Sequence, residues 1–141
     1  MKVLALHANF QMPTKGSLQA GAYDIYMPEA GSATDHTPTM VGLGFAAEVP
    51  PGHVAMIFPR SGVGAVHGLE LNNTCGVIDA DYRGEWKAAL KTKHFPAFKW
   101  SAGERILQFL IVPVLEVTME RVHKLDVSNR GLGGFGSSGK A

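Results

Sequence analysis

The sequence predicts an all-β domain, and three features of its 141 residues carry that prediction. Apolar runs are short and are separated by clusters of turn-forming residues, a pattern typical of β-sandwiches and β-barrels. Glycine is abundant, with 17 residues or about 12% of the chain, whereas proteins average roughly 7%. Residues 114–122 alternate between apolar and polar side chains, which is the period of a strand. Together these features favour many short strands joined by tight turns.

The composition is that of one globular domain, with 45% hydrophobic residues. The 13 basic and 12 acidic side chains give a net charge of +1, so neither nucleic acid nor an anionic membrane is expected as a partner. The longest apolar run, residues 106–115, is shorter than the roughly 20 residues that span a bilayer. Because the N-terminus lacks a signal-peptide pattern and Cys75 is the only cysteine, we expect a cytoplasmic protein without disulfides.

Turn signals divide the first half of the chain. Apolar runs predict strands over residues 3–6, 22–27 and 53–58. Residues 40–49 are also apolar and end at a strong turn signal, Pro-Pro-Gly. The segment 28–38 is a loop by composition, and residues 60–64 are too rich in glycine for a long helix.

A β-hairpin is expected further along, with strands at residues 76–79 and 85–90 joined by a loop that ends in Gly84. Two carboxylates, Asp79 and Asp81, lie around this turn. Paired carboxylates can bind a divalent metal or supply a general base, although aspartate is also common in ordinary turns. The residues alone therefore leave a catalytic and a purely structural interpretation open.

The segment before the C-terminal region also allows two interpretations. Ser101 and Glu104 match a helix capping box, but Pro113 would end that helix after about two turns. The alternation that follows has the period of a strand. We therefore expect two consecutive strands, at residues 105–113 and 114–122.

Residues 128–141 are rich in Gly and Ser and have no apolar period, so they cannot form a core of their own. We expect a β-domain over residues 1–127 and a flexible C-terminal arm over residues 128–141. The arm formally matches G-x-G-x-x-G, but a dinucleotide-binding motif needs a helix after it and only five residues follow. A disordered tail and a mobile anion-binding segment, with Arg130 for charge and Phe135 for stacking, both remain open.

Five segments, taken in order, resemble the five motifs of the trimeric dUTPases (deoxyuridine 5′-triphosphate nucleotidohydrolases). They are residues 21–25, 59–62, 76–84, 103–108 and 130–139. The third and fifth segments are long and specific, and the whole resemblance spans nearly the entire chain. Ala22 stands where the family usually has glycine, and Ser137-Ser138 stands where it usually has Ser-Thr.

The resemblance implies a jelly-roll β-sandwich assembled as a homotrimer, with active sites shared between subunits and the arm closing over each site. It implies Mg²⁺-dependent hydrolysis of dUTP to dUMP and pyrophosphate, which lowers dUTP, limits uracil in DNA and supplies dUMP for thymidylate synthesis. The expected location of the enzyme is the cytoplasm, which would be that of the host if the protein is viral. Some phage and viral members also bind regulatory proteins, which leaves such a partner open.

The resemblance also implies roles for individual residues. Asp79 matches the general base that activates water, and Asp24 matches a residue that reaches the metal through water. Tyr82 matches the ring that excludes a ribose 2′-hydroxyl. Arg105 is either a substrate contact or the structural partner of a carboxylate. The other expected contacts are Asn73, Gly76, Val77, Ile78 and Lys87 around uracil, Arg60, Ser61, Gly62 and Gln108 on phosphates, and Arg130, Phe135, Gly136, Ser137 and Ser138 in the arm.

Two functions other than dUTP hydrolysis are compatible with parts of this pattern. The dCTP deaminases are similar in fold and share parts of the motifs, but they are usually longer and lack the Gly-rich arm. A regulatory binding role could coexist with catalysis. The six histidines show no zinc-binding spacing, so a zinc site is not expected.

Overall fold

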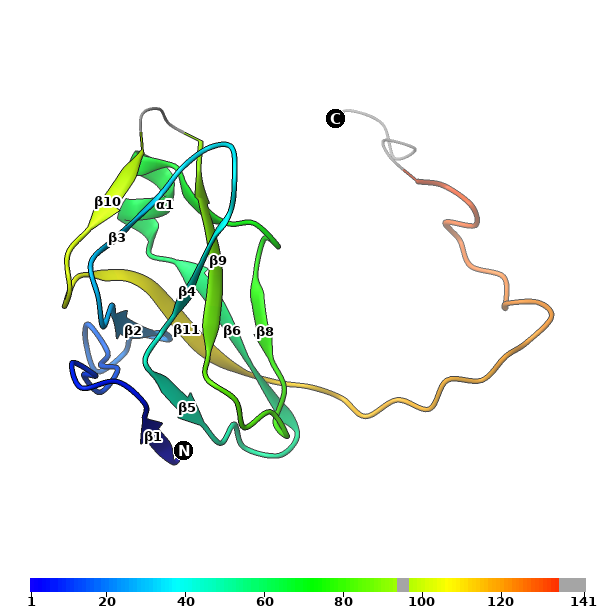
Figure 1. Ribbon diagram of the computed structural model, residues 1–141. Helices are drawn as coiled ribbons and strands as arrows, with labels where there is room; N and C mark the ends of the chain where they lie inside the picture. Colours follow the sequence, from blue (N-terminus) through cyan, green and yellow to red (C-terminus); the bar gives the residue numbers. More distant parts are fainter. Residues whose placement is uncertain (94–96, 135–141) are drawn as a thin grey trace.

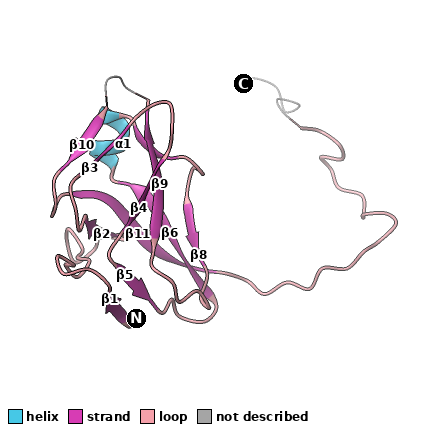
Figure 2. Cartoon of the chain, viewed as in Figure 1, coloured by secondary structure: helices cyan, strands magenta, loops and turns pink. Residues whose placement is uncertain are grey.

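The computed structural model describes residues 1–93 and 97–134, and strands dominate it (Figure 1, Figure 2). The strands are β1 (Val3–Ala5), β2 (Tyr23–Tyr26), β3 (Gly31–Ala33), β4 (Thr39–Gly42), β5 (Phe45–Ala47), β6 (His53–Pro59), β7 (Leu69–Leu71), β8 (Gly76–Ile78), β9 (Lys87–Thr92), β10 (Phe98–Trp100) and β11 (Arg105–Pro113). A seven-residue helix, α1 (Ser61–His67), follows β6. The all-β prediction is confirmed. Nowhere in the described chain is a helix long and apolar enough to cross a membrane.

Two larger sheets and two strand pairs make up the fold. One sheet has the order β2-β11-β6-β8, and the other has the order β4-β9-β7. The remaining pairs are β1-β5 and β3-β10, and all these ladders are antiparallel. The ladder between β6 and β11 has seven consecutive residue pairs, from His53 opposite Pro113 to Pro59 opposite Leu107. It forms the centre of the four-stranded sheet.

One hydrophobic core joins the two larger sheets. Trp86 is fully buried in it, and its ring lies 5.0 Å from that of Phe45 and 5.1 Å from that of Phe109. Phe109 belongs to β11, so these aromatic contacts connect the segment before β9 to the four-stranded sheet. The Trp86 main chain donates to the carbonyl of Phe45 and accepts from the N–H of Leu43, both at 2.9 Å. Aromatic packing and backbone pairing thus fix Trp86 between the layers.

The predicted hairpin between residues 76–79 and 85–90 is wrong. Strand β8 pairs with β6, whereas β9 pairs with β4 and β7. The chain between them therefore crosses from one sheet to the other instead of turning back on itself. Trp86, at the end of this connection, is fully buried against Phe45 and Phe109, so its burial favours the crossing between the layers.

The prediction of a strand at residues 105–113 is confirmed by β11. The capping-box residues form a turn instead of a helix start. The Glu104 carboxylate accepts the Ser101 N–H at 2.9 Å, and the Glu104 N–H donates to the Ser101 carbonyl at 3.2 Å. One contact of a capping box, from the Ser101 N–H to the Glu104 carboxylate, thus helps to close the turn before β11.

The predicted strand at residues 114–122 is wrong. These residues make no ladder with the described chain and extend away from the body of the domain (Figure 1). Their apolar side chains are exposed: Leu115 is 90% accessible and Met119 is 88% accessible. Alternation predicts a strand only where another strand offers its edge, and the single chain offers none here.

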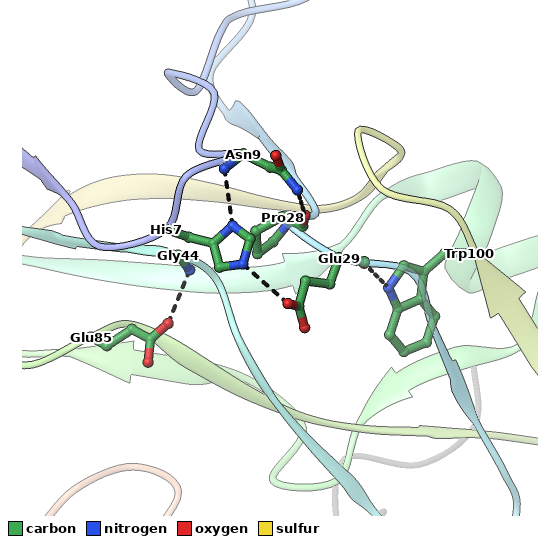
Figure 3. Close-up of polar contacts among 7 residues, drawn as sticks. All are labelled: His7, Asn9, Pro28, Glu29, Gly44, Glu85 and Trp100. Carbon is green, nitrogen blue, oxygen red and sulfur yellow. Dashed lines mark hydrogen bonds and ion pairs between the residues drawn. The ribbon is translucent and has the colours of Figure 1, made fainter.

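The predicted loop at residues 28–38 contains β3, which pairs with β10. Trp100 of β10 covers Gly31 of β3, and its indole N–H donates to the Glu29 carbonyl at 3.1 Å. Figure 3 shows that the Glu29 carboxylate also faces the imidazole of His7, with the nearest nitrogen and oxygen 3.1 Å apart. The pairing of β3 with β10 is therefore accompanied by close packing of Trp100 against Gly31.

Replacement of Gly31 by alanine should destabilise the domain. The new methyl group would clash with the Trp100 ring, reaching within 2.8 Å of Cε2, while the indole hydrogen bond to Glu29 holds that ring in place. We expect a loss of roughly 1–3 kcal/mol in the free energy of unfolding, as for other overpacked sites. Denaturant titration measures it. Gly16→Ala, with open space around its Cα, is the control, and an equal loss in both variants would contradict the packing argument.

Candidate functional site

A pocket of about 180 Å³ opens where β8 ends. Its lining consists of Val77, Ile78, Asp79, Tyr82, Glu85 and Lys87. Five of these six residues were expected from the sequence, including the candidate base Asp79 and the candidate sugar-facing ring of Tyr82. Glu85 was missed, although it lies directly after the third motif-like segment. The structure therefore brings the expected base and the expected nucleoside contacts to one place.

The turn after β8 presents Asp79 and Tyr82 to this pocket. The Tyr82 N–H donates to the Asp79 carbonyl at 3.2 Å, and the Tyr82 hydroxyl donates to the Glu85 carbonyl at 3.1 Å. The Arg83 guanidinium closes the turn by donating to the Ala80 carbonyl at 2.7 Å. Asp79 is exposed, and no residue of the described chain bonds to its carboxylate. Its oxygens are thus available to a water molecule.

A second polar cluster centres on Asp24 of β2. Asp24 is buried, with 6% of its surface accessible, and each carboxylate oxygen meets a guanidinium. Oδ1 lies 2.9 Å from Arg60 Nε, and Oδ2 lies 3.1 Å from Arg105 Nη1. Arg60 also donates to the Arg105 carbonyl at 3.2 Å. This geometry gives Arg105 a structural partner, which is one of the two roles considered for it.

The other expected phosphate contacts gather around this cluster. Gln108 on β11 lies opposite Asp24 in the sheet, and its side-chain amide donates to the Pro59 carbonyl at 3.1 Å. Ser61 and Gly62 follow Arg60 directly, in the first turn of α1. The end of β6 therefore collects arginine, hydroxyl and amide donors, the groups that bind phosphate oxygens.

The pocket and the Asp24 cluster lie at opposite ends of β6. Ile78, directly before Asp79, pairs with Ala55, and Arg60 lies five residues beyond Ala55. At about 3.4 Å per residue, these positions are separated by roughly 17 Å along the sheet. Strands β2 and β8 also occupy opposite edges of this sheet. Within one chain, the candidate base and the candidate phosphate-binding arginine do not meet.

The remaining expected residues are placed elsewhere. The Asn73 amide donates to the Cys75 carbonyl at 2.9 Å and does not line the pocket. Gly76 is buried in β8 against Ile57. Arg130 is exposed and donates to the Gly133 carbonyl at 2.8 Å. Phe135, Gly136, Ser137 and Ser138 lie outside the described residues.

The candidate site holds two carboxylates, Asp24 and Asp79. Mg²⁺ takes oxygen ligands of this kind and usually keeps several waters. Across residues 1–93 and 97–134, no three acidic, histidine or cysteine side chains cluster into a protein-built metal cage. Both oxygens of Asp24 already face guanidinium groups. The donor set of the described residues fits a metal that is held mainly by substrate oxygens and water.

Comparisons with known proteins identify the family of this chain. The dUTPase family model matches residues 8–139. The deoxyuridine 5′-triphosphate nucleotidohydrolase of Nautilia profundicola is 36% identical, and the match covers 99% of both chains. The enzyme of the same name from Candida albicans is 37% identical over 99% of this chain and 88% of its own.

A solved structure gives the same result for the fold. The dUTPase of Staphylococcus bacteriophage 80alpha, determined with dUPNHPP, superposes with a TM-score of 0.91 at 27% identity, and the match covers 99% of this chain and 98% of that one. The family model spans most of the chain, and relatives above 30% identity cover almost all of it. The chain therefore belongs to the dUTPase family.

Proposed function

We propose that this protein hydrolyses dUTP to dUMP and pyrophosphate in a Mg²⁺-dependent reaction, at sites that neighbouring chains of a homotrimer build together. The observation that carries the proposal is the pocket beside β8, which holds Asp79 and Tyr82 but lies far from Arg60. The named relatives favour this activity over the deamination of dCTP. Such hydrolysis would limit uracil in DNA and supply dUMP for thymidylate synthesis.

Asp79 is the proposed general base. Its carboxylate is exposed in the pocket and has no protein partner in the described chain, so it can accept a proton from a bound water. The water oxygen then forms a bond to the α-phosphorus while the bond from that phosphorus to the bridging oxygen breaks. Pyrophosphate leaves on the opposite side, as in-line transfer requires.

Arg60 is the proposed phosphate ligand at the other end of β6. Its Nε faces Asp24 and its Nη1 donates to the Arg105 carbonyl, while Nη2 has no partner among the described residues. The paired carboxylate therefore orients the guanidinium and leaves one nitrogen for a phosphate oxygen. Mg²⁺, when bound, would neutralise phosphate charge and help the pyrophosphate to leave.

The unpaired edge of β8 is the proposed binding surface for uracil. Strand β8 pairs only with β6 in its sheet, so the main-chain groups on its other side are free to bond a ligand. Val77 and Ile78 bring this edge to the pocket, with Lys87 opposite. Uracil and cytosine exchange donors and acceptors at two ring positions, so the wrong base would leave unpaired groups that cost about 1–3 kcal/mol each.

The exposed segment after β11 supports an assembly of several chains. Leu115, Val117 and Met119 alternate along it and are 67–90% accessible, which is costly for apolar side chains unless another surface covers them. We propose that neighbouring chains cover this segment, in a trimer of jelly-roll subunits, and that residues 128–141 then close over a neighbouring site. A regulatory protein partner stays a prediction.

Asp79→Asn should abolish most of the turnover, because the amide keeps the size of the side chain but cannot accept the proton. We expect kcat for dUTP to fall by roughly 10²–10⁴-fold, with little change in KM. Pyrophosphate release is the measurement. Asp81→Asn changes a carboxylate on the same turn that does not line the pocket, and it should lose far less. A fully active Asp79→Asn variant would refute the assignment.

Mixing two inactive variants should restore activity if neighbouring chains share each site. Asp79→Asn and Arg60→Ala damage opposite ends of β6, so a site formed by two different chains can receive an intact residue from each. With random mixing in a closed ring, about one quarter of the sites should be intact after joint refolding. Light scattering should show a trimer, and melting curves check that both variants fold. Complete absence of recovery in mixed trimers would place both residues in one chain's site.

Removal of residues 130–141 should leave the domain folded and reduce turnover strongly. The described part of this arm is exposed and contributes nothing to the core, whereas its Arg130 would contact bound phosphates. Melting temperature and dUTP hydrolysis are measured together. A control that lacks only Lys140 and Ala141 should behave like the full chain. Full activity of the longer truncation would show that the Gly-rich segment is only a tail.

A further inference from the structure

The ring of Tyr82 occupies the space where a side chain at position 84 would begin. A Cβ placed on Gly84 would lie 2.6 Å from Cζ of Tyr82 and would also clash with its hydroxyl oxygen. Such approaches fall well inside van der Waals contact. The present position of the Tyr82 ring and any side chain at Gly84 therefore exclude each other.

The backbone of Gly84 does not itself require glycine. Its φ lies outside the left-handed region, unlike that of Gly44 or Gly52. Alanine would fit the backbone conformation, and the atoms it would meet are the far end of one exposed side chain. The expected response to a methyl group is thus a displaced tyrosine ring in a domain that still folds.

Glu85 supplies a second restraint on the same ring. Its carbonyl accepts the Tyr82 hydroxyl at 3.1 Å, and its carboxylate accepts the Gly44 N–H at 3.1 Å (Figure 3). The carboxylate also lies against Gly42, where an added Cβ would approach Cδ to 2.9 Å. Glu85 therefore anchors the turn that carries Tyr82 to the connection between β4 and β5.

We propose that Gly84 and Glu85 are positioning residues for Tyr82, and that they set the preference for deoxyribonucleotides over ribonucleotides through it. The proposal rests on the proposed dUTP hydrolysis and on the sugar-facing role that the family resemblance implies for Tyr82. Steric exclusion of one hydroxyl depends on where the ring edge lies, so a small displacement is enough to admit the larger sugar. Gly84 leaves the space that the Tyr82 ring occupies. Glu85 holds the ring in place through its carbonyl, which accepts the Tyr82 hydroxyl.

The test compares kcat/KM for dUTP and UTP in Gly84→Ala, in Tyr82→Ala and in the double variant. We expect Gly84→Ala to lower the dUTP-to-UTP ratio by about tenfold, within the range that one small group contributes to discrimination. Its melting temperature should stay close to that of the parent. Gly16→Ala, which adds a methyl group in open space, should change neither quantity.

The double variant separates an effect through the ring from any other effect. With the ring absent, Gly84→Ala should change the ratio less than about twofold, because coupled residues are strongly non-additive. Variants of Glu85 provide an independent test. Glu85→Gln keeps an oxygen that can accept the Gly44 N–H and should retain most of the discrimination, whereas Glu85→Ala should lose it.

Each outcome has a definite meaning. If Tyr82→Ala lowers the ratio but Gly84→Ala does not, or if Gly84→Ala acts equally with and without the ring, the positioning role is overturned while the role of Tyr82 stands. Equal ratios in Glu85→Ala and the parent overturn the part assigned to Glu85. If Tyr82→Ala itself leaves the ratio unchanged, the sugar-facing role is wrong and the selectivity assigned to its neighbours falls with it.

Discussion

The seven-residue ladder between β6 and β11 sets the distance between the two halves of the candidate site. It holds β6 extended from His53 to Pro59, with Arg60 directly after the strand and Ile78, next to Asp79, paired with Ala55. Because the rise per residue in a strand is nearly constant, no local adjustment brings Asp79 to Arg60. In the proposed shared site, the two residues that contact one substrate would therefore come from different chains.

The two carboxylates of the candidate site, Asp24 and Asp79, differ in burial and in ion pairing. Asp24 is buried, and the cost of taking its charge out of water is offset by Arg60 and Arg105, which each contact one oxygen. Asp79 is exposed and has no partner in the described chain. A carboxylate held by two cations is suited to orient them, whereas an unpaired one is suited to accept a proton. The local environment thus distinguishes Asp24 from the proposed base, Asp79.

Local patterns in the sequence identify strands but not their partners. The apolar runs locate β2, β6 and β11, because burial and turn residues act at short range. The hairpin prediction failed because β8 pairs with β6, and β9 with β4 and β7, so the partners of both strands lie outside the local segment. Residues 114–122 have the pattern of a strand, but they pair with no strand of the described chain. The motif-like segments located most of the pocket, while Glu85 was missed because its function depends on the remote Gly44 N–H.

The glycine content of the sequence predicts tight turns, but turns account for only some of the glycines. The abundance of glycine predicts tight turns, and Gly44, Gly52, Gly68 and Gly103 do have the positive φ that such turns need. Other glycines have ordinary backbone angles and instead make room for one large side chain: Gly31 for Trp100, Gly42 for Glu85 and Gly84 for Tyr82. Composition cannot distinguish these two uses, because the second depends on which side chain the fold brings alongside. Two of these three contacts involve a side chain from the segment that carries Asp79 and Tyr82, so part of the glycine content shapes the candidate site itself.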